Sequence, residues 1–97
     1  MIRREGNRML IAGPATLQNI TALLGEGMAQ ITDGAESVDL AEVSELDSSL
    51  LAALLAWIRQ ARSMERRLNV ANLPEGLQTL AELYGVADLL PAAGSAE

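Results

Sequence analysis

The residues best suited to form a site are an acid followed by two hydroxyls, Asp47-Ser48-Ser49, which stand directly before an aliphatic stretch. A serine or aspartate in that position commonly caps a helix and stabilises it by about 1 kcal/mol. The start of such a helix also offers unpaired N–H groups and a positive dipole end, which favour a phosphorylated hydroxyl. The sequence leaves both roles open, because one of the three residues can cap the helix while another faces a partner.

Carboxylates are also concentrated before this point. Six acidic residues occur with no basic residue between them: Asp33, Glu36, Asp39, Glu42, Glu45 and Asp47. Such a run is usually a solvated surface, and the alternative is an acidic rim that steers a basic partner. Asp39 and Asp47 could serve as an acid–base pair, but no other residues indicate a substrate pocket around them. Asp39 lies within an apolar strand and therefore needs hydrogen-bond donors.

Composition excludes several classes of function. The 97 residues include no Cys and no His, so the chain cannot form a Ser-His-Asp arrangement, a zinc site of the usual kind or a disulfide. The net charge of −6 disfavours nucleic acid as a partner. No apolar stretch reaches the length of a membrane span or of a signal sequence. We expect a cytoplasmic protein with no cofactor and no direct membrane insertion.

Apolar periodicity predicts the elements that position these residues. In order, they are a hairpin over residues 1–5 and 8–12, a helix capped by Thr16, a strand over 38–40, a helix over 49–64, a strand over 68–71, a helix beginning near Pro74 and a short strand over 86–90. Strands alternating with helices indicate an α/β fold. We expect a single domain with a mixed, mostly parallel sheet of four or five strands, an N-terminal hairpin and helices packed mainly on one face.

The helix after Ser49 has more apolar residues than one buried stripe requires. Its inward stripe is predicted at Leu51, Leu54, Leu55 and Ile58. A second strip then consists of Leu50, Ala53 and Trp57, and the tryptophan is either part of the core or an anchor for a partner. We expect this second strip to be an exposed contact face beside Ser48.

The segment V-D-L-A-E-V-S-E-L-D-S-S-L, residues 38–50, resembles the signature of STAS domains. In that family an apolar strand ends in Asp, and a second Asp and a hydroxyl residue open the following helix. Asp39, Asp47, Ser48 and Ser49 match these positions. The resemblance implies a STAS domain over residues 1–91, and the small, polar residues 92–97 are predicted to be a disordered tail.

The end of the chain, L-A-E-L-Y-G-V-A-D-L-L-P over residues 80–91, resembles the MlaB-like branch of the family. This implies a non-enzymatic subunit that binds and regulates the ATPase of an ABC-type phospholipid transporter, the Mla system of outer-membrane lipid asymmetry. Its location would be peripheral to the inner membrane, through its partner. The predicted partner-binding residues are Thr16, Asp47, Ser48, Ser49, Leu50, Ala53 and Trp57.

Two other functions stay open. The first is an anti-sigma-factor antagonist that a serine-kinase anti-sigma factor regulates by phosphorylating Ser48. The second is a sensor that binds a small ligand on the open side of the sheet.

Overall fold

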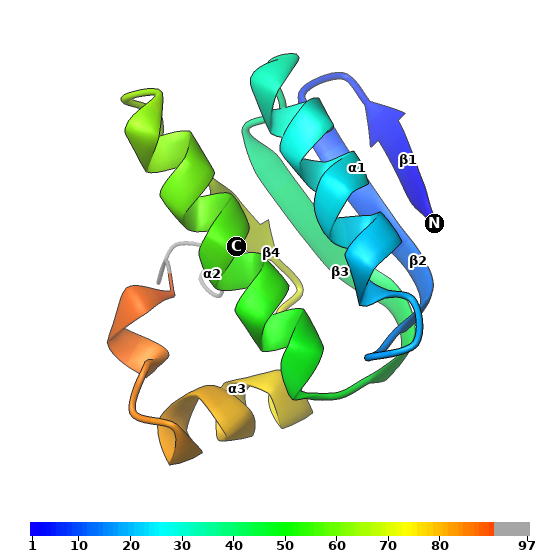
Figure 1. Ribbon diagram of the computed structural model, residues 1–97, viewed down its shortest axis with the longest axis vertical. Helices are drawn as coiled ribbons and strands as arrows, with labels where there is room; N and C mark the ends of the chain where they lie inside the picture. The colour runs from blue at the N-terminus through cyan, green and yellow to red at the C-terminus, as the bar shows by residue number, and fades with distance from the viewer. Residues whose placement is uncertain (91–97) are drawn as a thin grey trace.

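Four strands form one mixed sheet in the order β1-β2-β3-β4 (Figure 1). β1 (Ile2–Glu5) and β2 (Arg8–Ala15) are antiparallel and form the predicted hairpin. β3 (Ser37–Leu46) and β4 (Asn69–Ala71) continue the sheet in parallel pairing. The computed structural model describes residues 1–90, so the tail predicted over 92–97 lies outside the described residues.

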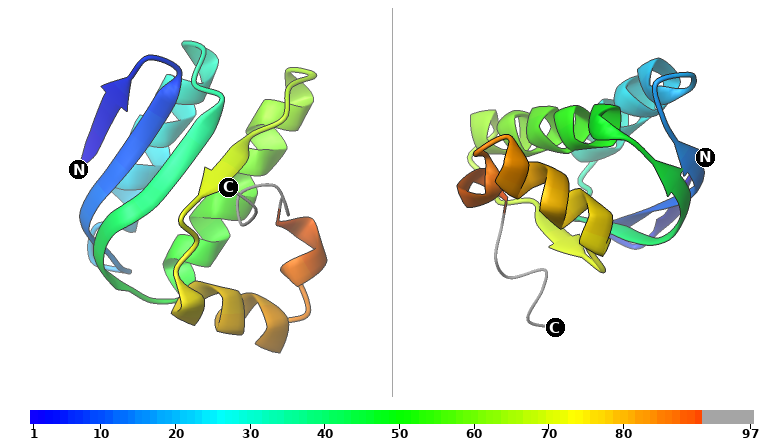
Figure 2. Two further views of the ribbon diagram at one scale, coloured as in Figure 1. Left: turned by 180° about the vertical axis from the view of Figure 1, so that it is seen from behind. Right: turned by 90° about the horizontal axis from the view of Figure 1, so that it is seen from below.

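The two long helices, α1 (Ile20–Thr32) and α2 (Ser48–Ser63), cover the same face of the sheet (Figure 2). The shorter α3 (Glu75–Leu83) lies at the end of the domain, next to the first turns of α2. This α/β arrangement, with an N-terminal hairpin and helices mainly on one face, confirms the predicted fold class.

The strand predicted over residues 86–90 is wrong. The segment instead forms a short 3-10 turn, η1 (Ala87–Leu89). The N–H of Leu89 donates to the carbonyl of Val86 at 2.9 Å, and the N–H of Leu90 donates to that of Ala87 at 3.1 Å. These bonds are local and need no neighbouring strand, which is why an apolar composition alone did not distinguish the two structures.

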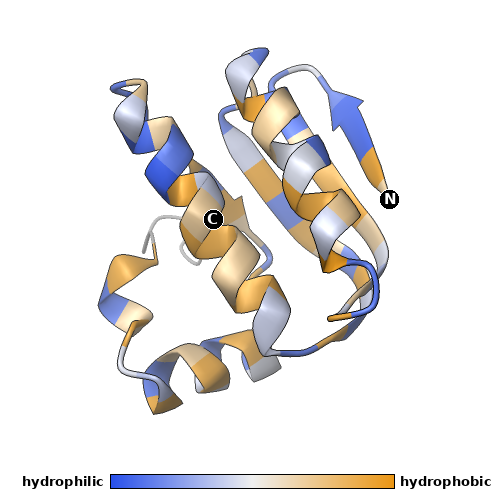
Figure 3. Cartoon of the chain, viewed as in Figure 1, coloured by the Kyte–Doolittle hydropathy of each residue, from blue (hydrophilic) through white to orange (hydrophobic). Residues whose placement is uncertain are grey.

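The core lies between the sheet and the two long helices. β2 contributes Met9 and Ile11, and β3 contributes Val38 and Leu40, all with exposures of 1% or less. Because side chains alternate along a strand, the residues between these point to the other face. Figure 3 shows apolar colouring on α1, α3 and the first half of α2, whereas most of β1 and the end of α2 are hydrophilic.

The contact between α1 and α2 depends on a glycine. A Cβ atom on Gly27 would lie 2.3 Å from the indole ring of Trp57, which is closer than any real side chain can approach. The indole N–H also donates to the carbonyl of Leu24 at 3.1 Å. Gly27 is therefore required for the close packing of the two helices, and Trp57 is fully buried beneath it.

β3 is longer and less regular than predicted. It has ten residues, and its register against β2 shifts twice, between Leu10 and Ala12 and between Gly13 and Pro14. Each shift inserts one extra residue into β3, as in a β-bulge. The strand consequently extends to Leu46 and brings the start of α2 to the end of the sheet.

Candidate functional site

Three segments meet at one end of the sheet, and we call this region the tip. They are the loop of residues 16–19 between β2 and α1, the last residues of β3 (Glu45 and Leu46) and the first turn of α2. β2 and β3 are parallel, and each leads into a helix on the same face. The loops that follow the carboxyl ends of such strands lie next to one another, which is where α/β sheets commonly place a site.

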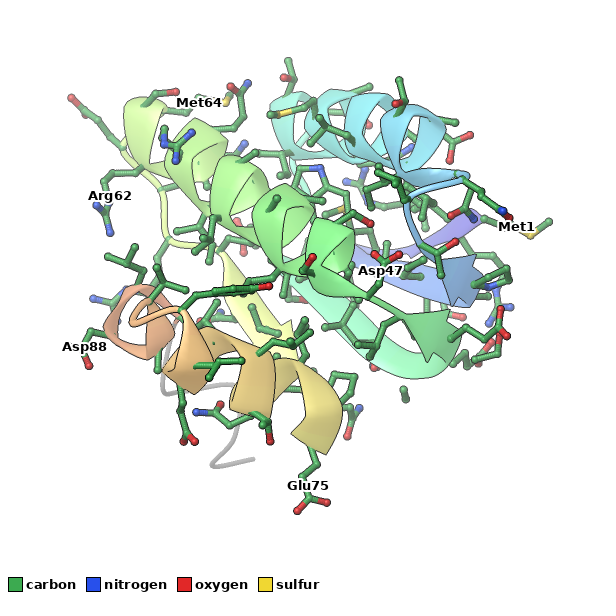
Figure 4. The ribbon with its side chains drawn as sticks, turned by 60° about the horizontal axis from the view of Figure 1, so that its bottom comes forward. Met1, Asp47, Arg62, Met64, Glu75 and Asp88 are labelled. Atoms are coloured by element: carbon green, nitrogen blue, oxygen red, sulfur yellow. The ribbon has the colours of Figure 1, made fainter. Side chains whose placement is uncertain are left out.

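Asp47 connects two of these segments. Its Oδ1 atom accepts the N–H of Ser49 at 2.9 Å and also the Ser49 hydroxyl. Its Oδ2 atom accepts the N–H of Leu17, in the loop before α1, at 2.9 Å. Figure 4 shows Asp47 between the first turn of α2 and that loop. One carboxylate therefore caps α2 and holds the neighbouring loop in place.

These bonds also fix the protonation state of Asp47. The Ser49 hydroxyl, the Leu17 N–H and the Ser49 N–H all donate to the carboxylate, in that order of effect, and lower its pKa below the ordinary value of 3.8. The charged form is the one that accepts hydrogen bonds. The side chain is consequently ionised at neutral pH, and the tip has a permanent negative charge.

Ser48 is the first residue of α2 and is exposed. Within residues 1–90 its hydroxyl has no hydrogen-bond partner, because Asp47 supplies the cap and Ser49 donates to Asp47. Of the two roles left open by the sequence, the geometry assigns the capping role. Asp47 caps the helix, Ser49 completes the cap, and the Ser48 hydroxyl is free to face solvent or a partner.

The prediction that Thr16 caps α1 is wrong. α1 begins four residues later, at Ile20, and Asn19 occupies the capping position. Asn19 instead folds the loop: its Oδ1 accepts the N–H of Thr16 at 2.8 Å, and its Nδ2 donates to the carbonyl of Pro14 at 2.6 Å. The delayed start places Thr16 and Leu17 in the loop at the tip, so Leu17 is 75% exposed instead of facing the core.

An open depression of about 570 Å³ lies at the tip. Its lining residues come from the loop before α1 and from the end of β3 with the cap of α2: Thr16, Leu17, Gln18, Glu45, Leu46 and Asp47. The walls combine apolar side chains with two carboxylates. A shallow depression of this kind can receive a protruding side chain of another protein.

The expectation of an exposed strip beside Ser48 is wrong. Leu50 and Trp57 are 0% exposed and Ala53 is 2% exposed, so all three belong to the core. Trp57 packs against Gly27 of α1, while Leu55 and Ile58 of the predicted inward stripe are only partly buried. The first turn of α2 therefore offers a partner its polar residues, with the apolar residues supporting the helix from within.

The acidic run does not gather at one place. Its first members, Asp33 and Glu36, precede β3, whereas Asp47 follows it, so they lie at opposite ends of the strand. Glu42 forms an ion pair with Arg3 at 3.3 Å. Only Glu45 and Asp47 line the depression. A continuous acidic rim is therefore absent from the described residues, and a smaller acidic pair remains at the tip.

Asp39 is structural. It is 5% exposed, and its carboxylate accepts the N–H of Ala41 and the Nδ2 of Asn72, both at 2.9 Å. Arg8 donates to it at 3.3 Å. The sequence predicted that this carboxylate needs donors, and it has them. Asp39 and Asp47 have separate sets of donors, Asp39 in the sheet and Asp47 at the tip.

Sequence reasoning missed Leu17 and Leu46 as tip residues, and it named Glu45 only as a member of the acidic rim. The spacing of Leu17 to Ile20 and Leu24 is helical, which favours a place in the buried stripe of a helix that starts at Thr16. The useful signal was Asn19, which is a better residue for a helix start than a position inside one. A helix that starts after Asn19 leaves Leu17 in the loop.

Two other features bear on function. Within residues 1–90, no helix combines the length and hydropathy that a membrane span requires. The same residues contain no group of three acidic, His or Cys side chains placed to hold a metal ion.

Similar folds occur in solved structures. The anti-sigma factor antagonist SpoIIAA in its unphosphorylated form aligns with a TM-score of 0.69 at 13% identity, over 94% of this chain and 84% of that one. The Bacillus cell fate determinant SpoIIAA in the phosphorylated form aligns with a TM-score of 0.67 at 13% identity, over 94% and 87% of the two chains. Mglu aligns with a TM-score of 0.54 at 23% identity, over 77% of this chain and 19% of Mglu. At these identities the likeness establishes the fold.

The sequence gives the family. None of the curated proteins compared with this sequence matches it. A family model described as "Mlab, STAS domain" matches residues 1–91, which is nearly the whole chain. The chain therefore belongs to the MlaB-like STAS domain family.

Proposed function

We propose that this chain is a non-enzymatic subunit that binds and regulates the ATPase of an ABC-type phospholipid transporter of the Mla kind. The observation on which the proposal rests is the match to the Mlab family over residues 1–91. The geometry of the tip supports it, because the Ser48 hydroxyl is exposed and uncommitted on a rigid helix start. In this proposal the chain reaches the inner membrane from the cytoplasm, through its partner.

The chemistry of the tip favours binding over catalysis. A general base at neutral pH needs a pKa near 7, whereas the pKa of Asp47 is lowered below 3.8. Both oxygens of Asp47 are already occupied by donors from Ser49 and Leu17. We therefore assign ATP hydrolysis to the partner. The STAS subunit would influence it by binding one conformation of the ATPase more tightly than another.

A pair of serine variants on α2 tests this function. Ser48 and Ser63 are the first and last residues of the helix, and both are exposed. We expect Ser48→Arg to weaken binding to the transporter ATPase roughly tenfold or more, because the new side chain stands in the centre of the proposed contact. Ser63→Arg, the matched control, should bind as the wild type does.

The measurement is co-purification of the tagged chain with the ATPase subunit of the Mla-type transporter from the same organism, followed by titration of the purified pair. A wild-type chain that fails to bind that ATPase would remove the proposed function. If Ser48→Arg and Ser48→Ala both bind normally, the ATPase remains the partner, but its contact does not lie at the tip.

An anti-sigma-factor antagonist is the second candidate, favoured by a specific observation. The Ser48 hydroxyl is accessible to a kinase, and the fold matches SpoIIAA in both its unphosphorylated and its phosphorylated form. A phosphate on Ser48 would stand beside the ionised Asp47, and the repulsion between the two charges would change the surface that a partner meets.

Kinase and partner assays separate the two candidates. The antagonist requires a serine kinase that phosphorylates the wild type but not Ser48→Ala. It also requires that Ser48→Asp no longer releases the sigma factor. If the neighbouring genes encode an ABC transporter and no such kinase modifies the chain, the antagonist function is excluded.

A further inference from the structure

The depression at the tip has a chemical character more specific than an acidic surface. Leu17 and Leu46 supply apolar atoms, and Glu45 and Asp47 supply carboxylates. Leu17 and Glu45 are both exposed. Long cationic side chains combine the same two properties, since their methylene stems pack on apolar surface while their charged ends stay at a polar edge.

The negative charge at the depression has no internal counterpart. The ion pairs within residues 1–90 involve Arg3, Arg4 and Arg8, and none of them includes Glu45 or Asp47. Arg3 neutralises Glu42, which does not line the depression. A cation brought by a partner would therefore find Glu45 available, while both Asp47 oxygens have donors within the chain.

The apolar wall is held in place before any partner arrives. The N–H of Leu17 donates to Asp47 at 2.9 Å, and the side chain of Asn19 accepts the N–H of Thr16 and donates to the carbonyl of Pro14. An exposed leucine on an ordered loop loses little conformational freedom when it is buried by a partner. This fixed position distinguishes Leu17 from an apolar residue that is exposed by chance.

We propose that the depression receives an arginine or lysine side chain of the ATPase subunit, with its stem against Leu17 and Leu46 and its charged end at the Glu45 carboxylate. The inference rests on the proposed function and adds the chemistry of recognition. Asp47 acts as a positioning residue, because it orients Leu17 and leaves the contact with the cation to Glu45.

The apolar part is tested with two leucines of equal exposure. Leu17 at the tip and Leu83 at the end of α3 are each 75% exposed. We expect Leu17→Ala to raise the Kd for the purified ATPase about tenfold, because an apolar contact is lost on binding. Leu83→Ala should leave the Kd unchanged. If the two variants lose the same amount of affinity, Leu17 does not form the proposed apolar contact.

The charged part is tested through salt. We expect Glu45→Gln to weaken binding roughly two- to fivefold at low ionic strength and to make the Kd less dependent on salt than in the wild type. Glu65→Gln is the control, because Glu65 is an exposed acid just beyond the opposite end of α2. If Glu45→Gln has the same Kd and the same salt dependence as the wild type, the proposal that a cationic side chain binds at Glu45 is wrong.

The positioning role of Asp47 is tested with a double-mutant cycle. In Asp47→Asn one oxygen is replaced by an NH₂ group, so the side chain can still cap α2 but cannot also accept the Leu17 N–H. We expect Asp47→Asn to weaken binding in the wild type and to have a smaller effect in a Leu17→Ala background. Equal effects in both backgrounds would contradict an action through Leu17.

The two levels of the proposal fail differently. If the wild type does not bind the ATPase, the proposed function and this inference fall together. If Ser48→Arg abolishes binding while Leu17→Ala and Glu45→Gln bind normally, the function stands and the cation-receiving depression is overturned.

Discussion

The first turn of α2 and its middle have opposite surroundings, although they belong to one helix. Ser48 is exposed with an uncommitted hydroxyl, whereas two turns later Trp57 is completely buried against Gly27 of α1. The tip is fixed by hydrogen bonds to a single carboxylate, and the middle is fixed by close packing. Substitutions in the middle should therefore change stability, and substitutions at the tip should change binding.

The largest effect on stability is expected when a buried leucine is compared with an exposed one. Leu54, in the middle of α2, is 0% exposed, and Leu17 is 75% exposed. We expect Leu54→Ala to lower the free energy of unfolding by about 2–5 kcal/mol, because it leaves a cavity in the core. Leu17→Ala should change it by less than about 0.5 kcal/mol. Urea denaturation measures both values, and similar losses would break the distinction between tip and core.

Two glycines of α1 test the close packing between α1 and α2. A Cβ on Gly27 would overlap Trp57, whereas a Cβ on Gly25 would have no atom within 4 Å. We expect Gly27→Ala to destabilise the fold by about 1–3 kcal/mol through overpacking. Gly25→Ala should stabilise it by up to about 1 kcal/mol, because alanine favours a helix. Chemical denaturation of the two variants should show changes in the free energy of unfolding that have opposite signs.

The tip should respond to pH through Asp47. Its folded-state pKa lies below the ordinary value of 3.8, so the carboxylate stabilises the fold above that pH. This contribution is lost as the pH falls through the folded-state pKa. We expect the melting temperature of Asp47→Asn to lie a few degrees below that of the wild type at neutral pH. The difference should shrink between roughly pH 5 and pH 2.

The control for that measurement is Glu65→Gln, because Glu65 is exposed and takes part in none of the ion pairs within residues 1–90. If the difference in melting temperature between Asp47→Asn and the wild type stays constant across the acid range, the charge of Asp47 does not contribute to the stability of the fold.

The smallest stability effect is expected for Ser48→Ala. The Ser48 hydroxyl has no partner within residues 1–90, and alanine is the best helix former, so the free energy of unfolding should change by less than about 0.5 kcal/mol. Thermal denaturation checks this. A loss of 1 kcal/mol or more would mean that Ser48 belongs to the cap, and the separation of roles between Asp47 and Ser48 would be wrong.

Local signals were sufficient for much of the fold. The hairpin around Gly6-Asn7 and the limits of α2 follow from residues close together in the sequence: α2 was predicted over 49–64 and occupies Ser48–Ser63. The capping group was also visible, because Asp47 stands directly before the aliphatic stretch. These features depend on turn chemistry and periodicity within a few residues.

Two of the errors concern contacts between distant segments. α2 has enough apolar residues for two stripes, and Gly27, thirty residues before Trp57, decides that Trp57 faces inward. Likewise, the bond from the Leu17 N–H to Asp47 joins residues thirty positions apart and belongs to no local pattern. Such contacts assemble the depression at the tip, so the sequence pointed to Thr16 and Asp47 but not to the complete set of lining residues.

The two edges of the sheet have a consequence for the behaviour of the protein in concentrated solution. β1 has four residues, Ile-Arg-Arg-Glu, and β4 has three, after which Asn72 turns away with a φ of 57° and donates to Asp39. Short, charged or interrupted edge strands are poor templates for further strand pairing. We therefore expect neither edge of the sheet to favour edge-to-edge aggregation.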